Sequence, residues 1–501
     1  MAIPKDILAV ERPVNTIVFA YGKEKNLYAV KQRIGCKRKD GRNIPVTGAT
    51  IGHIVDHAYV PIDGDILSVR KAPITLKDWA NVKLCMNLSA DIREEIRKFY
   101  SKEDADKIYT IAILRVCDAG IKDYQLKAEY EESFLSEEIP GVALSKNTVC
   151  EFINNLGKSY SRIVSFMQYK VSSVCDNHHL LIDGTLKSDE SNVNSLSDYS
   201  RKAKDKGKKD ISLLYAYDLE KMEPVASKCF PGNMLDLTAY EGFVSEYKIT
   251  KGILVGDKGF PSNSIENFIR DNDGLHYINP LKRNSAYIKE FGLYTYQGIF
   301  GENNISYCKA KSAKKGEEDK YLYLFRDNRL AQCEEKTWLE KRKKNNNFDN
   351  SEWEEAKPQF GTILLESDLN LDASVIYNAY SERWKIELVM RYYKSACDLD
   401  ETRVHDDYSV IGGEFINFFA SQISARLINL LDSTQLSDKY SYSRFMRILE
   451  KAKKARTENE SSWYLVKLTP SYVEVLQKIG LLEKANVEAP VRRGRPKKKA
   501  I

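Results

Sequence analysis

The spacing of hydrophobic residues changes several times along the 501-residue chain and divides it into regions of different predicted structure. In residues 1–75, short apolar runs such as 15–20 and 27–30 alternate with turns, which predicts a small β-rich segment. A polar stretch at 37–43 breaks this pattern in the manner of a hairpin turn. Within 76–172 the apolar residues recur at helical spacing, which predicts a helical domain.

Two serines mark predicted helix starts within this helical region. Ser101 begins a helix expected to stop at Gly120, and Ser145 begins one expected to stop at Gly157. The pair could form a helix-turn-helix that reads DNA, or it could simply pack within a helical bundle. The helical region is therefore a candidate DNA-binding domain.

After residue 172, patterns typical of strands alternate with helical ones. The predicted strands lie at 179–182, 211–217, 225–230, 252–256 and 276–280. The predicted helices between the later strands lie at 237–247 and 262–270. This order predicts a mixed α/β sheet within a catalytic domain that spans residues 173–434.

A turn-rich, strand-like stretch at about 283–368 interrupts this order and predicts a β-rich insertion. A long helix is then expected to begin near Asp372 and to continue past Lys394. An apolar helix is expected at 414–431, and residues 435–490 are expected to form a C-terminal helical region with two further helices.

Composition excludes several classes of protein. No apolar run approaches the roughly 20 residues that cross a bilayer, and the N-terminus has no signal-like apolar segment, so we expect a cytoplasmic protein without a membrane partner. The nine cysteines never form a Cys-x-x-Cys pair, which argues against a disulfide framework and a zinc ribbon.

The net charge of +6 does not by itself require a nucleic-acid partner. The basic residues are concentrated at 201–209, 309–315, 336–344 and 492–499.

Two aspartates directly follow apolar runs of strand type. Asp183 follows residues 180–182, and Asp257 follows residues 253–256. A buried strand would deliver each carboxylate to its open end, where a hard divalent cation such as Mg²⁺ needs oxygen ligands. Two such ions stabilise the attacking and the leaving oxygen of an in-line phosphoryl displacement. Each aspartate could instead be a turn or cap residue.

A third acidic residue lies on the long predicted helix. At about 100° per residue, Arg383, Glu387 and Lys394 fall within about 60° of one another, on a polar stripe that Tyr380 begins. An adjoining apolar arc is typical of a side that faces the core. The charged face of any amphipathic helix would show the same periodicity, so spacing alone leaves both interpretations open.

The identities of these four residues add a further observation. Tyr380, Arg383, Glu387 and Lys394 reproduce the pattern Tyr-x2-Arg-x3-Glu-x6-Lys. It resembles the Tyr-Arg-Glu-Lys (YREK) signature of bacterial insertion-sequence transposases of the DDE type. Three further segments are similar to that family, namely Phe-Pro-Gly-Asn at 230–233, Asp-Lys-Gly-Phe at 257–260 and Pro-Leu-Lys at 280–282. The resemblance covers about residues 140–430.

The resemblance implies an RNase H-like catalytic domain in which Asp183, Asp257 and Glu387 hold two Mg²⁺ or Mn²⁺ ions. It implies that water attacks the phosphodiester at the end of the element and that the freed 3′-hydroxyl is the nucleophile in strand transfer. The implied partners are terminal inverted repeats and target DNA, bound by a nucleoid-associated homodimer that pairs two ends.

The resemblance also suggests residues that contact DNA. Tyr380, Arg383 and Lys394 are expected to do so. Trp338 and Trp353, in the insertion, are candidates for stacking on an extruded base, and burial in the core is the alternative.

The tail at 491–501 contains Arg-Gly-Arg-Pro, which resembles an AT-hook. Arg493, Arg495 and Lys497 are therefore expected to contact a narrow A·T minor groove and its phosphates. A basic tail that binds DNA without specificity is the alternative.

Two other functions stay open. An RNase H-like nuclease could cleave without strand transfer, because it would use the same carboxylates. A catalytically silent DNA-binding protein derived from a transposase is the second alternative, and the presence of all three acidic residues argues against it.

Overall fold

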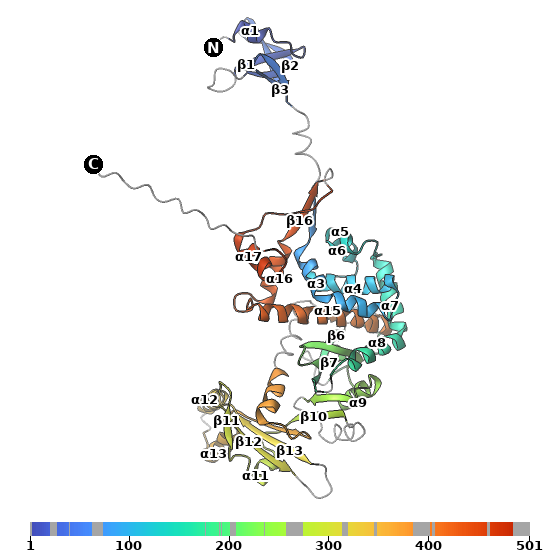
Figure 1. Ribbon diagram of the computed structural model, residues 1–501, viewed down its shortest axis with the longest axis vertical. Helices are drawn as coiled ribbons and strands as arrows, with labels where there is room; N and C mark the ends of the chain where they lie inside the picture. Colours follow the sequence, from blue (N-terminus) through green and yellow to red (C-terminus); the bar gives the residue numbers. More distant parts are fainter. Residues whose placement is uncertain are drawn as a thin grey trace, which may run out of the picture. The chain divides into compact units, whose positions relative to one another are not determined.

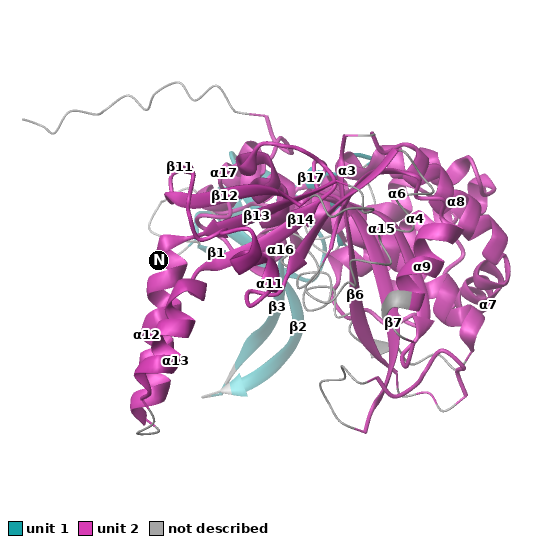
Figure 2. Ribbon diagram, turned by 90° about the horizontal axis from the view of Figure 1, so that it is seen from below, with its two compact units in different colours: residues 1–75, 455–464 teal, residues 76–454, 465–501 magenta. Residues whose placement is uncertain are grey.

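The computed structural model divides the chain into two compact units (Figure 2). Unit 1 comprises residues 1–75 and 455–464, and unit 2 comprises 76–454 and 465–501. The structure describes residues 3–20, 28–39, 41–62, 74–175, 177–189, 191, 193–200, 207–234, 236–256, 274–312, 319–344, 348–383, 401–402, 406–457 and 461–483. Within these ranges no helix is both long and apolar enough to cross a membrane.

Unit 1 contains a four-stranded antiparallel sheet with the order β1-β2-β3-β4. Its elements are α1 (Lys5–Leu8), β1 (Thr16–Ala20), β2 (Tyr28–Lys39), β3 (Arg42–Val55) and β4 (Ala58–Pro61). A small core joins Ile7, Val18, Tyr28, Val30 and Ile54. The predicted strands at the start of the chain are confirmed.

The prediction that a polar stretch breaks the strand at 37–43 is wrong for most of that stretch. β2 and β3 extend to Lys39 and from Arg42, so they form one long hairpin. The outer part of this hairpin lies beyond the small core, and its described residues bury no side chains against it. Its sequence therefore does not show the alternation of apolar residues that marks a strand packed on a core.

A helical bundle opens unit 2. Its elements are α3 (Ala80–Arg97), α4 (Lys102–Cys117), α5 (Leu126–Glu132), α6 (Leu135–Glu138), α7 (Lys146–Lys158), α8 (Tyr160–Ser172) and the later α15 (Asp407–Ser433), all labelled in Figure 1. Both predicted caps are confirmed, because Ser101 accepts from the Asp104 N–H and Ser145 from the Thr148 N–H. α4 is the central helix, since every residue from Ala105 to Cys117 is buried.

The two capped helices do not form a helix-turn-helix. That motif needs a turn of about three or four residues, whereas α5 and α6 lie between α4 and α7. The predicted stop at Gly157 is also wrong, because α7 continues to Lys158. Gly157 is buried where α7 packs against α15, and a side chain there would meet the carbonyl oxygen of Tyr408.

The part of unit 2 that was predicted to be catalytic is built on five strands with the order β8-β7-β6-β9-β10. They are β6 (His179–Asp189), β7 (Lys209–Asp218), β8 (Glu223–Pro231), β9 (Lys251–Val255) and β10 (Gly274–Leu281), with α9 (Asp236–Glu246) before β9. β6, β7 and β8 are antiparallel neighbours, and β6, β9 and β10 run parallel. Numbered along the chain, the order is 3-2-1-4-5, the arrangement of an RNase H-like sheet, and the predicted fold class is confirmed.

The same sheet continues into the stretch predicted as an insertion. β10 pairs with β14, which is followed across the sheet by β13, β12 and β11. The elements are α11 (Ala286–Glu290), β11 (Gly298–Phe300), β12 (Ile305–Ser312), β13 (Lys320–Arg326), α12 (Asn328–Lys344), α13 (Asn350–Ala356), η1 (Lys357–Gln359) and β14 (Thr362–Ser367). α12 was not predicted because only Ala331 of its 17 residues is buried, which leaves no apolar stripe.

The C-terminal part contains both helices expected there, α16 (Tyr442–Glu450) and α17 (Pro470–Lys478). A short sheet of β17 (Tyr464–Leu465), β16 (Lys453–Thr457) and β5 (Ile74–Asp78) was not predicted. β15 (Glu401–Thr402) pairs with the end of β6. α15 begins at Asp407, seven residues before its expected start, because the Asp406 side chain caps it.

Candidate active site

Asp183 lies in the middle of β6. The strand runs on to Asp189 and stays paired with β7, where Tyr215 is the register partner of Asp183. The expectation that the strand ends at Asp183 is therefore wrong. The apolar run ends at Asp183, but β6 continues because polar residues after it make contacts in the folded protein. Lys187, for example, forms an ion pair with Glu414 of α15.

Asp183 is half-buried and stands beside two fully buried tyrosines. Its Oδ1 accepts a hydrogen bond of 2.9 Å from the Gly184 N–H. The rings of Tyr215 and Tyr217 stack with their centroids 5.9 Å apart. Burial, and after it the charge of Asp183, raises the pKa of Tyr217, so this phenol stays neutral near the carboxylate.

β9 lies parallel to β6 and is paired with it up to Leu181, two residues before Asp183. Leu181 of β6 is the register partner of Val255, the last residue of β9. The N–H of Gly256 then donates a hydrogen bond of 2.9 Å to the carbonyl of Ile278 in β10. Asp257 lies outside the described residues.

Residues 373–383 form a helix that carries the first half of the Tyr-Arg-Glu-Lys pattern. Its Tyr377 ring packs against Phe300 of β11 and Phe325 of β13, with centroids 5.5 and 5.1 Å away. Tyr380 is only 8% exposed, so the predicted polar stripe begins at a buried residue. The Arg383 guanidinium lies 5.7 Å from the Tyr380 ring.

The remaining predicted site residues lie outside the described residues. They are Glu387 and Lys394 of the signature and Arg493, Arg495 and Lys497 of the tail.

A buried polar chain links β6 to the helical bundle and was not predicted. The Lys187 Nζ lies 2.5 Å from the Glu414 Oε1, which also accepts from the Asn417 amide at 2.9 Å. The Arg115 Nη1 of α4 donates to the Asn417 Oδ1 at 2.7 Å. Lys187 follows Asp183 by four positions, so this set of contacts anchors the strand that carries the candidate carboxylate.

A second group of potential metal ligands lies near the beginning of β6. His178, Asp218 and Glu220 offer ligand atoms within 4.8 Å of one another. The His178 Nδ1 already lies 2.8 Å from Asp218, and the His179 Nδ1 lies 2.5 Å from Glu220. Burial raises the pKa of Glu220, but the hydrogen bonds from His179 outweigh it and lower that pKa. These contacts account for the group as a structural link between β6 and the turn after β7.

The two tryptophans of the insertion are neither buried nor fully exposed. Trp338 of α12 and Trp353 of α13 lie with ring centroids 5.4 Å apart, and both are half-buried. Phe360 lies within 6.3 Å of Trp338, and the Arg342 guanidinium lies 5.1 Å from the Trp338 ring. The rings therefore hold α12 and α13 together. This differs from the predicted alternative, in which each tryptophan would be buried in the core.

The five-stranded sheet and the insertion lie within a region that matches a known protein family. Residues 165–410 match the family model of the transposase DDE domain. A chain in the cryo-EM structure of a piggyBac transposase synaptic complex with hairpin DNA is 12% identical, with a TM-score of 0.38 over 74% of this chain and 80% of that chain. No curated protein sequence matches the chain. The family match begins in α8, covers the five catalytic strands and the insertion, and ends at the start of α15. It identifies residues 165–410 as a transposase DDE domain and the protein that carries it as a DNA transposase.

Proposed function

We propose that Asp183, Asp257 and Glu387 are the catalytic carboxylates of this transposase and that together they hold two Mg²⁺ or Mn²⁺ ions. The observation that carries the proposal is the register of β6 and β9. Leu181 and Val255 are partners across these parallel strands, and each precedes one of the two aspartates by two residues. Parallel strands in register bring equivalent positions to the same place on a sheet.

The helix at 373–383 supports the assignment of Glu387. Its buried side includes Ala373, Ile376 and Tyr380. Seven residues make about two helical turns, so a helix of unchanged periodicity would carry Glu387 on the side of Tyr380. That side faces the protein, as a third ligand to a shared site must.

The chemistry of the donor set fits a hard divalent cation. The three proposed ligands are carboxylates, and Asp183 is a half-buried carboxylate. Oxygen donors without thiolate or imidazole favour Mg²⁺ and Mn²⁺. When bound, two such ions stabilise the attacking and the leaving oxygen of an in-line phosphoryl displacement. The protein's own part in this proposal is to hold the three carboxylates in fixed relation.

The proposed reaction has two steps on DNA. Water first cleaves a strand at the end of a bacterial insertion sequence, and the freed 3′-hydroxyl then attacks target DNA. We further propose that Arg383, Lys394 and the tail residues Arg493, Arg495 and Lys497 contact DNA, whereas Tyr380, which is only 8% exposed, supports the helix from within the fold. A homodimer would pair the two ends.

The test combines three substitutions with separate binding and cleavage assays. Asp183→Asn, Asp257→Asn and Glu387→Gln should each abolish Mg²⁺-dependent cleavage of end DNA while binding to the same DNA changes little. Asp438→Asn and Glu474→Gln alter exposed acids in the C-terminal part and should cleave normally. Near-normal cleavage by any of the three variants would remove that residue from the site.

Strand transfer needs its own assay. Pre-cleaved ends with a free 3′-hydroxyl should be joined to a target duplex by the wild-type protein and not by the three variants. Cleavage without joining would favour the RNase H-like nuclease.

A further inference from the structure

The hairpin of β2 and β3 extends beyond the sheet of unit 1. β1 pairs with β2 only over Tyr28–Gln32, and β4 pairs with β3 only over Gly52–Val55. The Arg33 N–H still donates a hydrogen bond of 2.7 Å to the Asn15 carbonyl. From Ile34 outward, the described residues of the two strands pair with each other as far as Lys39 and Arg42. Figure 2 shows this part as a long two-stranded ribbon in unit 1, and we name residues 33–46 the β-arm.

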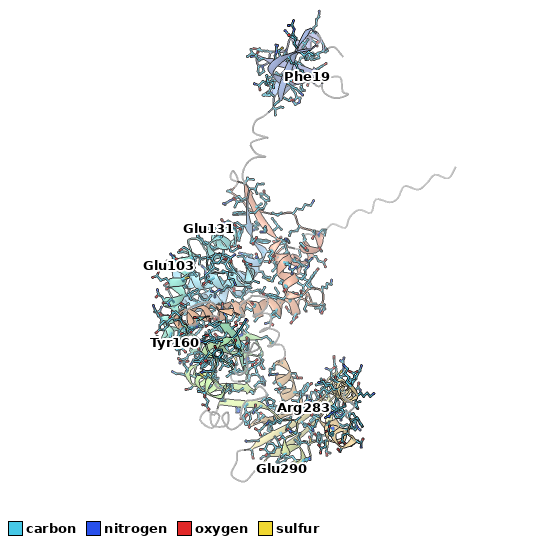
Figure 3. The ribbon with its side chains drawn as sticks, turned by 180° about the vertical axis from the view of Figure 1, so that it is seen from behind. Phe19, Glu103, Glu131, Tyr160, Arg283 and Glu290 are labelled. Atoms are coloured by element: carbon cyan, nitrogen blue, oxygen red, sulfur yellow. The ribbon has the colours of Figure 1, made fainter. Side chains whose placement is uncertain are left out.

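The β-arm is exposed and carries an excess of positive charge. Arg33, Lys37 and Arg38 are exposed, as is Ile34 at 64%. Between residues 28 and 55 the sequence holds six lysines and arginines but only one acidic residue, Asp40. At the base of the arm, the Lys31 Nζ lies 5.4 Å from the ring of Phe19, which Figure 3 labels.

Both faces of the β-arm present a cation. Lys37 is the register partner of Ile44 and Arg38 that of Asn43, and neighbouring residues of a strand point to opposite faces. Register shifts between Val30 and Gly35 add local twist at the base of the arm. The arm is therefore a twisted, two-sided basic ribbon.

We infer that the β-arm binds double-stranded DNA and enters its major groove. That groove is about 12 Å wide and admits a two-stranded ribbon, whereas the minor groove is only about 6 Å wide. Five residue steps from Arg33 to Arg38 span about 17 Å, which corresponds to about five base pairs at 3.4 Å each. Cations on both faces suit a ribbon that lies between two phosphate backbones. The exposed isoleucines offer apolar contacts to thymine methyl groups.

Protection of the strand edges is the other explanation for these charges. Lysines and arginines on edge strands discourage pairing with a second copy of the chain. That role requires little more than one or two charges for each edge. The near absence of acidic residues and the presence of cations on both faces are instead what a polyanion requires. The inference concerns a surface of unit 1 and does not depend on the proposed catalytic residues.

The first experiment measures DNA binding by the full-length chain without a metal ion, so that cleavage plays no part. The triple variant Arg33→Gln/Lys37→Gln/Arg38→Gln should bind a duplex about tenfold or more weakly at 0.1 M salt. Its plot of log K against log salt should be shallower by about two to three units, since each lost phosphate contact contributes about 0.9.

A matched control removes the same charge elsewhere. Lys102→Gln/Lys127→Gln/Lys439→Gln changes three exposed lysines of unit 2 and should keep the wild-type salt slope. Equal affinities and slopes for the two triple variants would overturn the inference. Loss of self-association with unchanged DNA binding would also overturn it, because the arm would then be a contact between copies.

A second experiment tests the groove and needs no charge to be removed. Cys36 is exposed on the β-arm, and the Arg33 Nη2 lies 3.0 Å from its sulfur. A duplex that carries a disulfide-activated tether on cytosine C5, in the major groove, should cross-link to wild-type protein and not to Cys36→Ser. Cross-linking only from a tether on guanine N2, in the minor groove, or from neither tether would contradict the inference.

Discussion

The ion pair of Lys187 and Glu414 is the most deeply buried pair of opposite charges described above. The two residues are 4% and 5% exposed. Removing a charge from water costs several kcal/mol, and only a close partner of opposite charge offsets that cost. Asn417 supplies a further hydrogen bond to Glu414. The pair thus fixes β6 against α15, four residues after Asp183.

Removing one member of this pair should therefore destabilise the protein strongly. Glu414→Gln is expected to lower the free energy of unfolding by about 3–5 kcal/mol, because it leaves the Lys187 ammonium buried without a counter-charge. Chemical denaturation measures the change. The double variant Lys187→Met/Glu414→Gln should recover most of the loss. If it is no more stable than the single variant, the cost lies in lost packing and not in an unpaired charge.

At the scale of elements, α7 and α15 cross with their backbones in contact. A β-carbon at Gly157 would lie 1.8 Å from the carbonyl oxygen of Tyr408, and one at Gly412 would lie 2.0 Å from that of Ile153. Neither position tolerates a side chain unless the helices separate. The crossing therefore depends on one glycine from each helix.

Gly157→Ala or Gly412→Ala should lower the melting temperature, because separating packed helices costs about 1–3 kcal/mol or more. Gly413→Ala is the matched control on the same helix. Its nearest neighbour, a methyl group of Ile153, would lie 3.9 Å from the new carbon. This control should be neutral or slightly stabilising, since alanine favours a helix over glycine by about 1 kcal/mol. Equal effects at positions 412 and 413 would show that the crossing is not the cause.

These elements also show what the sequence could and could not predict. The strands β6 to β10 follow apolar runs, and the serine caps have a local signature, so both were predictable. Glycine is common where helices end, which is why the pattern predicts a helix end at Gly157. Its actual reason, contact with Tyr408, joins residues far apart in the chain and leaves no local pattern.

The candidate site also has features that the sequence predicts and features that depend on tertiary structure. Asp183 stood out because it follows an apolar run, and the Tyr380 helix because of its spaced residues. The length of β6 beyond Asp183 depends on Lys187 meeting Glu414, which only tertiary structure brings together. The packing of Tyr377, one turn before Tyr380, likewise depends on the strands of the insertion.

At the scale of the whole molecule, several carboxyl groups make stability depend on pH. Burial, followed by the charge of Asp78, raises the pKa of Asp118 and of Glu450. Burial, followed by the charge of Asp118, raises the pKa of Glu129. Burial would also raise the pKa of Asp91, but the hydrogen bond and the charge of Arg426 outweigh burial and lower that pKa.

The two kinds of shift act in different pH ranges. A lowered pKa contributes stability above the ordinary value, 3.8 for Asp91, and that stability is lost as pH falls further. A raised pKa means that the folded protein holds its proton more tightly, so stability falls as pH rises through the range between the ordinary and the raised value. For these four carboxyl groups, stability should therefore be greatest close to their ordinary values of 3.8 and 4.5, and it should fall both in stronger acid and towards neutrality.

The variant Glu129→Gln tests the effect of a carboxyl group whose pKa is raised in the folded protein. Because this variant removes a carboxylate whose ionisation opposes folding, it should raise the melting temperature at pH 7.5 by about a degree or two. It should also reduce the difference between the melting temperatures at pH 4.5, the ordinary value for this carboxyl group, and at pH 7.5. Glu290→Gln, which alters an exposed acid of α11 that Figure 3 labels, is the control and should change neither quantity. A loss of stability at pH 7.5 would mean that the Glu129 charge is favourable.

The pairing of β10 with strands on both sides limits how this enzyme can be remodelled. β9 and β14 each satisfy one edge of β10, and β14 returns from the far end of the stretch at 283–368. Excising that stretch as a cassette would also remove β14. The remaining domain would end in an open row of backbone N–H and C=O groups, which invites strand pairing between molecules. A smaller version of the enzyme would therefore need a substitute strand at this edge before any question of activity arises.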